Sequence, residues 1–219
     1  EKAYDAYEFH KVYKLLDNFC GVTLSRVYHD ILKDRLYTYA ANSPERRSSQ
    51  TAIDIISDAL IQAAAPILTF TADEAFSFKN GAEFSENSVH LQDWPKIGAE
   101  YLDADVCAGV DKILALRENA NEELERLRQS KEIGKSLEAE IEIEVGAGSP
   151  EAEALRKYSA NLPEIFIVSS VKVSEGDFEA PKVRAAKAEG RRCSRCWRVL
   201  PDLPEDGICP RCKKAVSQS

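Results

Sequence analysis

Four cysteines near the end of the chain have the type and spacing that bind a metal ion. They form two Cys-x2-Cys pairs separated by twelve residues, and they are Cys193, Cys196, Cys209 and Cys212. Each pair can supply two thiolates from one tight turn, and four thiolates match the tetrahedral preference of Zn²⁺. A pair of redox dithiols is the alternative chemistry, but this double spacing is strongly specific for zinc. We therefore predict one structural zinc ion, with no open coordination position for catalysis.

The residues around these cysteines are mostly basic and include a tryptophan. Trp197 directly follows the second cysteine. The cations on either side of the motif are Arg191, Arg192, Arg195, Arg198, Lys213 and Lys214. An aromatic ring among cations suits the unstacked bases and phosphates of single-stranded RNA. The alternative is that Trp197 packs over the metal turns as a small core while the arginines are only solvated.

The charge of the chain is unevenly distributed. The whole chain has a net charge of -8, yet from Lys182 onward ten Lys and Arg residues stand against four Asp and Glu residues. The tail is thus +6 and the remainder -14. A polyanionic partner is expected to contact mainly the tail.

Composition excludes several classes of protein. No apolar run approaches the roughly 18 residues that span a bilayer, and the first ten residues lack the features of a signal peptide. Clustered cysteines without a secretion signal indicate a reducing, cytoplasmic setting. The sequence has no methionine, which favours a piece of a longer chain. Cys20 and Cys107 lie singly in helical patterns and are expected in the core. No constellation of catalytic residues is found.

The first hundred residues have the periodicity of helices. Apolar residues recur at helical spacing from residue 4 to about 40, with Gly21 marking a bend or break. Ser43 and Pro44 predict the start of a second helix. A capping box at 71–74 predicts the start of a third, with Phe76 on its buried face. Residues 80–98 look irregular, with an extended piece at 89–91. An antiparallel helical bundle is expected.

Beyond residue 100 the pattern changes from helical to mixed. A long helix is predicted over about 103–130, and alternating residues at 138–145 predict a half-exposed strand. A short helix, a buried strand and a third strand are expected at 149–161, 165–173 and 183–187. The fold class is thus mainly α, with a small α/β junction unit and a four-cysteine zinc module. The expected parts are 1–98 (helical bundle), 99–136 (connecting helix), 137–188 (junction) and 189–219 (zinc module).

Several segments resemble a known family. Residues 32–37 (Leu-Lys-Asp-Arg-Leu-Tyr), 46–51 (Arg-Arg-Ser-Ser-Gln-Thr) and 65–74 (Ala-Pro-Ile-Leu-Thr-Phe-Thr-Ala-Asp-Glu) resemble the anticodon-binding domain of class I aminoacyl-tRNA synthetases for isoleucine, valine and leucine. Residues 128–139 and the Cys-Ser-Arg-Cys-Trp motif at 193–197 are similar to the bacterial-type isoleucyl enzymes. These segments cover most of the chain in the family's order.

The resemblance implies the C-terminal part of a longer ligase used in protein biosynthesis. That part would hold the anticodon stem-loop of isoleucine tRNA so that a separate catalytic domain can attach isoleucine using ATP. The His-Ile-Gly-His and Lys-Met-Ser-Lys-Ser signatures of catalysis are absent from this sequence. We therefore expect no ATP or catalytic site here, a monomer, and isoleucine tRNA and the rest of the same chain as partners, without DNA or membrane.

The resemblance also implies roles for individual residues. Arg195 and Trp197 match the family motif and are the leading candidates for contact with the anticodon loop. Phosphate contacts are expected from Arg191, Arg192, Arg198, Lys213 and Lys214. Arg46 and Arg47 could contact the tRNA stem, or could form ion pairs on the helix surface. For Lys33, Asp34 and Arg35 we favour an internal charge network over RNA contact.

Three other interpretations remain open at this point. The same region of a valyl or leucyl enzyme would have similar helices but is expected to lack this zinc module. A DNA-repair glycosylase can end in a related four-cysteine finger, but it needs a β-rich body. A zinc-stabilised bundle that binds only protein is the third alternative, and salt-dependent RNA affinity would distinguish it from an RNA-binding region.

Overall fold

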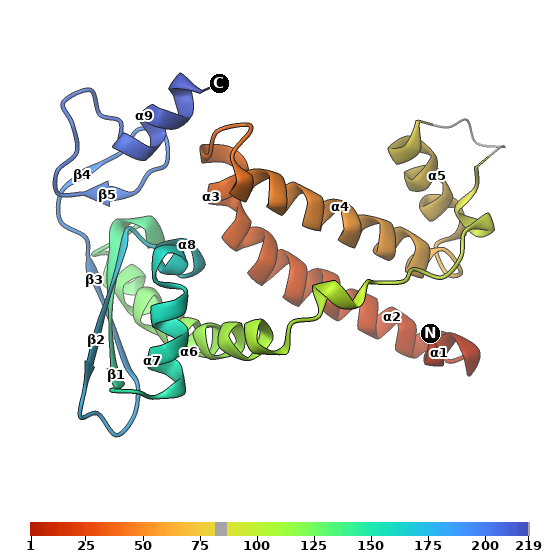
Figure 1. Ribbon diagram of the computed structural model, residues 1–219, viewed down its shortest axis with the longest axis horizontal. Helices are drawn as coiled ribbons and strands as arrows, with labels where there is room; N and C mark the ends of the chain where they lie inside the picture. Colours follow the sequence, from red (N-terminus) through yellow and green to blue (C-terminus); the bar gives the residue numbers. More distant parts are fainter. Residues whose placement is uncertain (82–86, 219) are drawn as a thin grey trace. The chain divides into compact units, whose positions relative to one another are not determined.

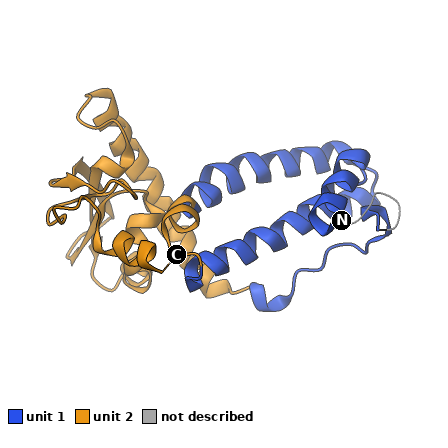
Figure 2. Cartoon of the chain, turned by 90° about the horizontal axis from the view of Figure 1, so that it is seen from above, with its two compact units in different colours: residues 1–32, 42–101 blue, residues 33–41, 102–219 orange. Residues whose placement is uncertain are grey.

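The computed structural model describes residues 1–81 and 87–218. The chain divides into two compact units, one formed by residues 1–32 and 42–101 and the other by residues 33–41 and 102–219 (Figure 2). Among the described residues no helix combines the length and the apolar character needed to cross a membrane. The four-part division expected from the sequence is finer than these two units and stays a prediction.

Helices make up the first unit (Figure 1). They are α1 (Lys2–Asp5), α2 (Phe9–Asn18), a π-helical stretch (Phe19–His29), α3 (Asp30–Thr38), α4 (Pro44–Ala64), α5 (Thr69–Asn80) and short 3-10 turns at Val89–Leu91 and Ala99–Tyr101, with the end of α3 belonging to the second unit. The predicted helix over 4–40 is interrupted at Tyr7, whose φ is 56°. Gly21 does not break it, because the π-helical stretch carries the helix through this position.

The expected start of α4 is confirmed, whereas that of α5 is wrong. Ser43 Oγ accepts a hydrogen bond of 3.2 Å from the backbone N–H of Arg46, and Pro44 occupies the first helical position. In contrast, α5 begins at Thr69, two residues before the predicted capping box, and its N-terminus has no side-chain cap. Phe76 is buried as expected.

The acidic residue of the predicted capping box has a tertiary role instead. The Asp73 carboxylate accepts hydrogen bonds from Ser88 Oγ at 2.6 Å and from the backbone N–H of Val89 at 2.9 Å. These bonds fix residues 88–91 against α5, and Ser88 Oγ also accepts from the N–H of His90 at 3.2 Å. The expected extended piece at 89–91 is therefore a 3-10 turn. Residues 82–86 of the predicted irregular segment lie outside the described residues.

The second unit combines a long helix with a small mixed sheet. Its elements before the cysteines are α6 (Ala104–Gln129), β1 (Ala139–Gly146), α7 (Pro150–Lys157), α8 (Leu162–Ile165), β2 (Ser170–Gly176) and β3 (Lys182–Lys187), with 3-10 turns at Ser136–Glu138 and Ser159–Asn161. The strand order is β2-β1-β3; β1 pairs in parallel with β2 and antiparallel with β3. The expected β-α-β-β unit is thus confirmed.

One predicted strand lies in the wrong place. The buried apolar run Ile165–Val168 does not form a strand, because α8 occupies residues 162–165 and β2 begins only at Ser170. Ile167 has a φ of 56°, which turns the chain between the two elements. Phe166 and Val168 are nevertheless fully buried. A short apolar run signals burial, and here the burial is that of a turn inside a parallel crossover.

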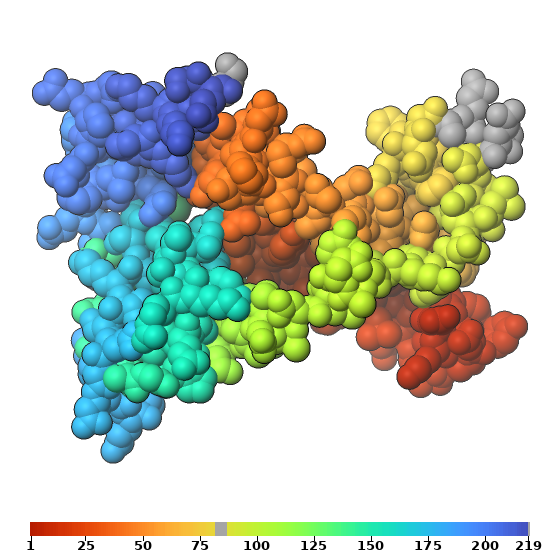
Figure 3. Space-filling view, viewed as in Figure 1, coloured from red at the N-terminus to blue at the C-terminus, as the bar shows by residue number. Residues whose placement is uncertain are grey.

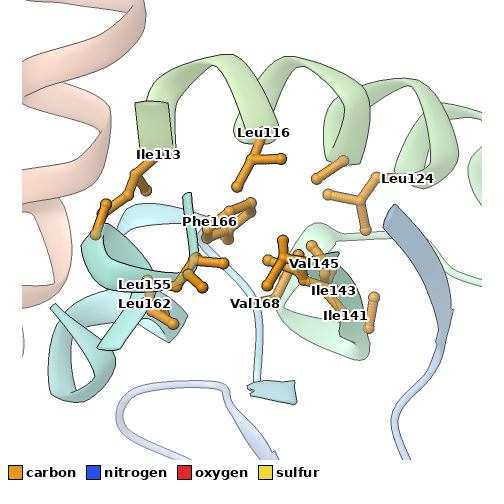
Figure 4. Close-up of a cluster of buried hydrophobic side chains, with 14 of the residues drawn as sticks. Ile113, Leu116, Leu124, Ile141, Ile143, Val145, Leu155, Leu162, Phe166 and Val168 are labelled. Atoms are coloured by element: carbon orange, nitrogen blue, oxygen red, sulfur yellow. The ribbon is translucent and has the colours of Figure 1, made fainter. Parts of the chain in front are cut away.

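The core of the second unit lies between α6 and β1. Ile113, Leu116 and Leu124 project from α6 towards Phe166 and the buried face of β1 (Figure 4). On β1 the residues facing this core are Ala139, Ile141, Ile143 and Val145, all fully buried. The glutamates between them face away, as the period of two requires. Ile133 extends this core into the turn at 131–138.

The two isolated cysteines are not core residues. Cys20 and Cys107 are both exposed, contrary to the expectation from their helical patterns. Cys107 lies in the first turn of α6, where residues 104–108 are all exposed. Helical periodicity assigns residues to faces, but it does not show which turns of a long helix are covered by another element.

A test of this core compares two neighbouring residues of β1. Ile143→Ala removes a fully buried side chain and should lower the free energy of unfolding by about 3–4 kcal/mol. Denaturant unfolding of the second unit followed by circular dichroism measures this change. Glu142→Ala on the exposed face is the control and should stay within about 0.5 kcal/mol of wild type. Equal effects of the two substitutions would contradict the assigned faces of β1.

Candidate metal centre and nucleic-acid interface

The four cysteines converge in the second unit. Cys193 and Cys196 lie on the turn between β4 (Arg191–Arg192) and β5 (Val199–Leu200), and Cys209 and Cys212 lie at the start of α9 (Pro210–Ser217). All four are buried, and their sulfur atoms lie within 4.8 Å of one another. In Figure 3 the dark-blue atoms of this module adjoin the lighter blue atoms of the residues before it. The predicted set of four ligands is therefore brought together by the fold.

The donor set fits a zinc ion. Zn–S bonds of about 2.3 Å in a tetrahedron place sulfur atoms about 3.8 Å apart. The Cys196 and Cys209 sulfur atoms are 3.8 Å apart. The backbone N–H groups of Cys209 and Cys212 point to the sulfur atoms of Cys193 and Cys209, at 3.3 and 3.5 Å. Such N–H donors stabilise thiolates, which are the form that binds metal.

The thiols differ in their ease of ionisation. Burial alone would raise the pKa of Cys193, but the backbone N–H groups of Cys196, Cys209 and Arg195 lower this pKa to about 6. Burial raises the pKa of Cys196 to about 12, and the neighbouring thiols Cys212 and Cys209 add to the increase. One sulfur is thus ready to bind as a thiolate, while its neighbours need the charge of a cation to lose their protons.

Two glycines allow the tight path of the chain around the sulfur cluster. Gly207 has a φ of 72°, and its carbonyl accepts a hydrogen bond of 2.9 Å from the N–H of Ser194, which joins the two cysteine turns. Gly190 has a φ of 120°, and a methyl group at this position would lie 2.2 Å from the carbonyl oxygen of Leu200. Only glycine satisfies that close approach.

The cysteine module is joined to the end of α3 by charged hydrogen bonds. The Arg211 guanidinium binds both carboxylate oxygens of Asp34, donates to Thr38 Oγ1 at 3.2 Å, and lies 5.0 Å from the centre of the Tyr39 ring. Arg195 donates to the carbonyl of Thr38. A bidentate arginine–carboxylate pair is among the stronger polar contacts in proteins, so segment 33–41 is held against the module.

The ion pair with Arg211 changes the titration of Asp34. Burial of this carboxyl group opposes ionisation, but the hydrogen bonds and charge of Arg211 prevail and lower the pKa of Asp34. The carboxylate therefore stays charged, and the pair intact, throughout the neutral range.

Two further contacts join α3 and the cysteine module to the segment between α7 and β2. Arg35 forms an ion pair with Glu164, which is almost completely buried. Burial raises the pKa of Glu164, and the charge of Arg35 offsets only part of this increase. Arg198 donates two hydrogen bonds to the carbonyl of Ser169, at 3.1 and 2.5 Å. The predicted internal network is thus confirmed for Asp34 and Arg35.

The predicted RNA contacts occupy different environments. Arg195 and Arg198 are half-buried and donate to backbone carbonyls. Arg191 is exposed overall, but its guanidinium donates to the carbonyl of Leu203. Arg192, Lys213 and Lys214 are exposed, and Lys213 forms a 2.7 Å ion pair with Asp206. Arg191 therefore bonds within the module, whereas Arg195 and Arg198 attach the module to neighbouring segments. Contact of these three arginines with RNA stays a prediction.

Trp197 is displayed at the surface. Its side chain is 49% exposed and does not belong to the cluster that Leu203 forms with the cysteines. Its φ is 67°, and its N–H donates to the carbonyl of Cys193 at 3.0 Å, so the cysteine turn itself presents the ring. The alternative of a ring buried over the metal turns is wrong.

Two remaining candidates lie in the other unit, at the start of α4. Arg46 is half-buried, and Arg47 is exposed and donates a 3.4 Å hydrogen bond to Gln50. Arg47 thus makes a polar contact along the surface of its own helix. A role of either arginine in binding the tRNA stem stays a prediction.

Two further side chains of this region were not among the predicted candidates. Lys135, in the turn after α6, places its Nζ atom 4.6 Å from the centre of the Trp197 ring. Arg211, on the first turn of α9, binds Asp34. The opposite charges were visible in the sequence, yet 177 residues separate Asp34 from Arg211, so no local spacing links them.

Comparison with known proteins identifies the class of this chain. Residues 1–143 match the family described as the anticodon-binding domain of tRNA ligase, and the chain belongs to this family.

Isoleucine–tRNA ligases match the chain over nearly its whole length. Those of Symbiobacterium thermophilum, Natranaerobius thermophilus and Thermotoga petrophila are 41%, 36% and 39% identical over 98%, 100% and 95% of the chain. The chain spans about a quarter of the length of these curated relatives. It corresponds to the anticodon-binding region of isoleucine–tRNA ligase.

The joint between the module and α3 can be tested with Asp34→Ala. The side chains of Asp34 and Arg211 are only 23% and 29% exposed, so losing the pair should lower the free energy of unfolding by about 2 kcal/mol at pH 7. Asp206→Ala, which breaks the exposed pair with Lys213, should cost less than about 1 kcal/mol. Thermal unfolding of both variants measures the difference.

This effect should depend on pH in a defined direction. Because the folded pKa of Asp34 is lowered, its contribution is fully present above the unfolded value of about 3.9. The gap between wild type and Asp34→Ala should close as the pH falls through the folded pKa. A gap that stays constant down to pH 2 would show that the pair does not act through charge.

Proposed function

We propose that this chain is the tRNA-binding C-terminal region of a cytoplasmic isoleucine–tRNA ligase. It would bind the anticodon stem-loop of isoleucine tRNA while a catalytic domain elsewhere in the same protein attaches isoleucine using ATP. The observation that carries this proposal is the similarity of 98% of the chain to an isoleucine–tRNA ligase at 41% identity. The four-cysteine module is part of the matched length, which favours the isoleucyl enzyme over the valyl and leucyl ones.

The metal in this proposal is one structural Zn²⁺ ion bound by Cys193, Cys196, Cys209 and Cys212. The buried sulfur atoms and their backbone N–H donors support this assignment. Four protein ligands would saturate the ion, so it would stiffen the module rather than activate water. The ion would hold the turn that presents Trp197, together with the start of α9 that presents Arg211.

Recognition would take place on unpaired nucleotides. An A-form stem hides base edges in its deep, narrow major groove, whereas the bases of an anticodon loop can be splayed out and stacked. The exposed ring of Trp197 supplies a stacking surface, and the exposed Arg192 and Lys214 supply charge for phosphates. Half-buried Arg195 and Arg198 would shape the surface and present their remaining donors to the loop.

The metal assignment predicts one zinc ion per chain. Elemental analysis of protein prepared without chelators should give a stoichiometry near one, and Cys209→Ser should lower both zinc content and the unfolding temperature of the module. Cys107→Ser, at an exposed cysteine outside the cluster, is the matched control and should change neither. If the protein contains no zinc and the module is nevertheless folded, the zinc site is excluded.

The RNA assignment predicts a specific loss of affinity in the full-length ligase. Trp197→Ala should weaken binding of isoleucine tRNA by about 5- to 150-fold, because a stacked base contributes about 1–3 kcal/mol. Filter binding across a salt series measures affinity and its salt dependence together. Phe178→Ala, an exposed aromatic residue beyond β2, is the control and should bind like wild type. Affinity that does not vary with salt would favour the protein-binding alternative.

A further inference from the structure

The turn between α6 and β1 contributes a cation to the exposed tryptophan. The Nζ atom of Lys135 lies 4.6 Å from the centre of the Trp197 ring. A lysine ammonium within about 6 Å of a ring centre is attracted by the negative face of the ring. Lys135 is exposed, and Trp197 remains 49% exposed although one face of its ring carries this cation. The pair therefore lies at the surface, open to a ligand.

The backbone that presents Lys135 is fixed on both sides. Before it, the N–H of Gly134 donates a 2.8 Å hydrogen bond to the Glu138 carboxylate. After it, Ser136 Oγ accepts a 2.5 Å hydrogen bond from Arg128 of α6. Lys131 begins the turn in the left-handed region, with a φ of 62°. These bonds thus fix the backbone from which the Lys135 side chain extends to the ring of Trp197.

The charges around the pair are those of an anion site. The N–H of Gly134 is the main cause of the lowered pKa of Glu138, and the nearby charges of Arg192 and Lys187 lower it further. The Glu138 carboxylate is thus hydrogen-bonded within its own turn and lies near two other cations. In the part of the chain that the structure describes, Lys135 has no carboxylate within salt-bridge distance. Its ammonium remains available for a phosphate.

We propose that Lys135 is a further RNA-contacting residue and forms, with Trp197, a binding site for one unpaired nucleotide. The base stacks on the ring of Trp197, and the ammonium of Lys135 binds the phosphate of that nucleotide or of its neighbour. The turn at 131–138 is then a second wall of the interface, separated in sequence from the cysteine module. This inference deepens the proposed function and rests on it.

The test uses the full-length ligase and isoleucine tRNA. Lys135→Ala should weaken binding about fivefold, as expected for one partly hydrated charged contact. It should also reduce the slope of log affinity against log salt by about 0.7–0.9, because one phosphate contact is lost. Lys135→Arg should restore both values. The double variant with Trp197→Ala should lose less than the sum of the two single losses, since both act on one nucleotide.

Lys157→Ala is a matched control. Lys157 is the last residue of α7, and its Nζ atom lies 5.5 Å from the centre of the ring of Tyr158, the next residue, so it forms the same kind of pair in the same unit but away from the cysteine turns. This variant should bind tRNA like wild type. Zinc content and circular dichroism check the fold of each variant, and Lys135→Gln replaces Lys135→Ala where the alanine variant is unstable.

The outcomes separate this inference from the proposed function. Wild-type ligase that does not bind isoleucine tRNA overturns both. If Trp197→Ala weakens binding but Lys135→Ala behaves like Lys157→Ala, the inference fails and the proposed function stands. If Lys135→Ala binds tRNA less tightly but the slope of log affinity against log salt is unchanged, the inference is also overturned, because Lys135 would then only support the ring.

Discussion

The residues after β3 fold around sulfur atoms rather than around a hydrocarbon core. Leu203 is the large aliphatic residue buried with the four cysteines, and among the residues that the structure describes the half-buried Leu200 and Ile208 pack against this cluster. An apolar cluster of this size cannot offset the conformational entropy of about thirty residues. Everything that the module presents, including the positive φ of Trp197 and the start of α9, therefore depends on the convergence of the four sulfur atoms.

The module is in turn attached to the rest of the second unit through arginines. Arg211 and Arg195 bind the end of α3, and Arg198 binds the carbonyl of Ser169 before β2. Each guanidinium has five donors in a fixed fork, so it can hold a backbone or carboxylate oxygen and retain donors for another partner. The same basic residues can thus position the surface and take part in binding a polyanion.

The exposed face of the module is assembled from two distant segments. Trp197 comes from the first cysteine turn and Lys135 from the turn after α6, and the core of α6 and β1 fixes the latter. This arrangement couples the shape of the proposed interface to the packing of the junction unit. A defect in that core would alter the surface without touching a single basic residue.

The sequence alone determined the four cysteines that cluster, most of the helical and alternating segments and the basic character of the tail. These features follow from local spacing: two cysteines per turn, apolar residues at helical intervals, and charges counted along the chain. The resemblance to the family motif led to the prediction that Trp197 contacts the anticodon loop. The start of α5, the position of β2 and the exposure of Cys107 were mispredicted, because each depends on what covers the segment in space. Only the tertiary structure paired Asp34 with Arg211 and Lys135 with Trp197, since contacts across such separations arise from the packing of whole elements.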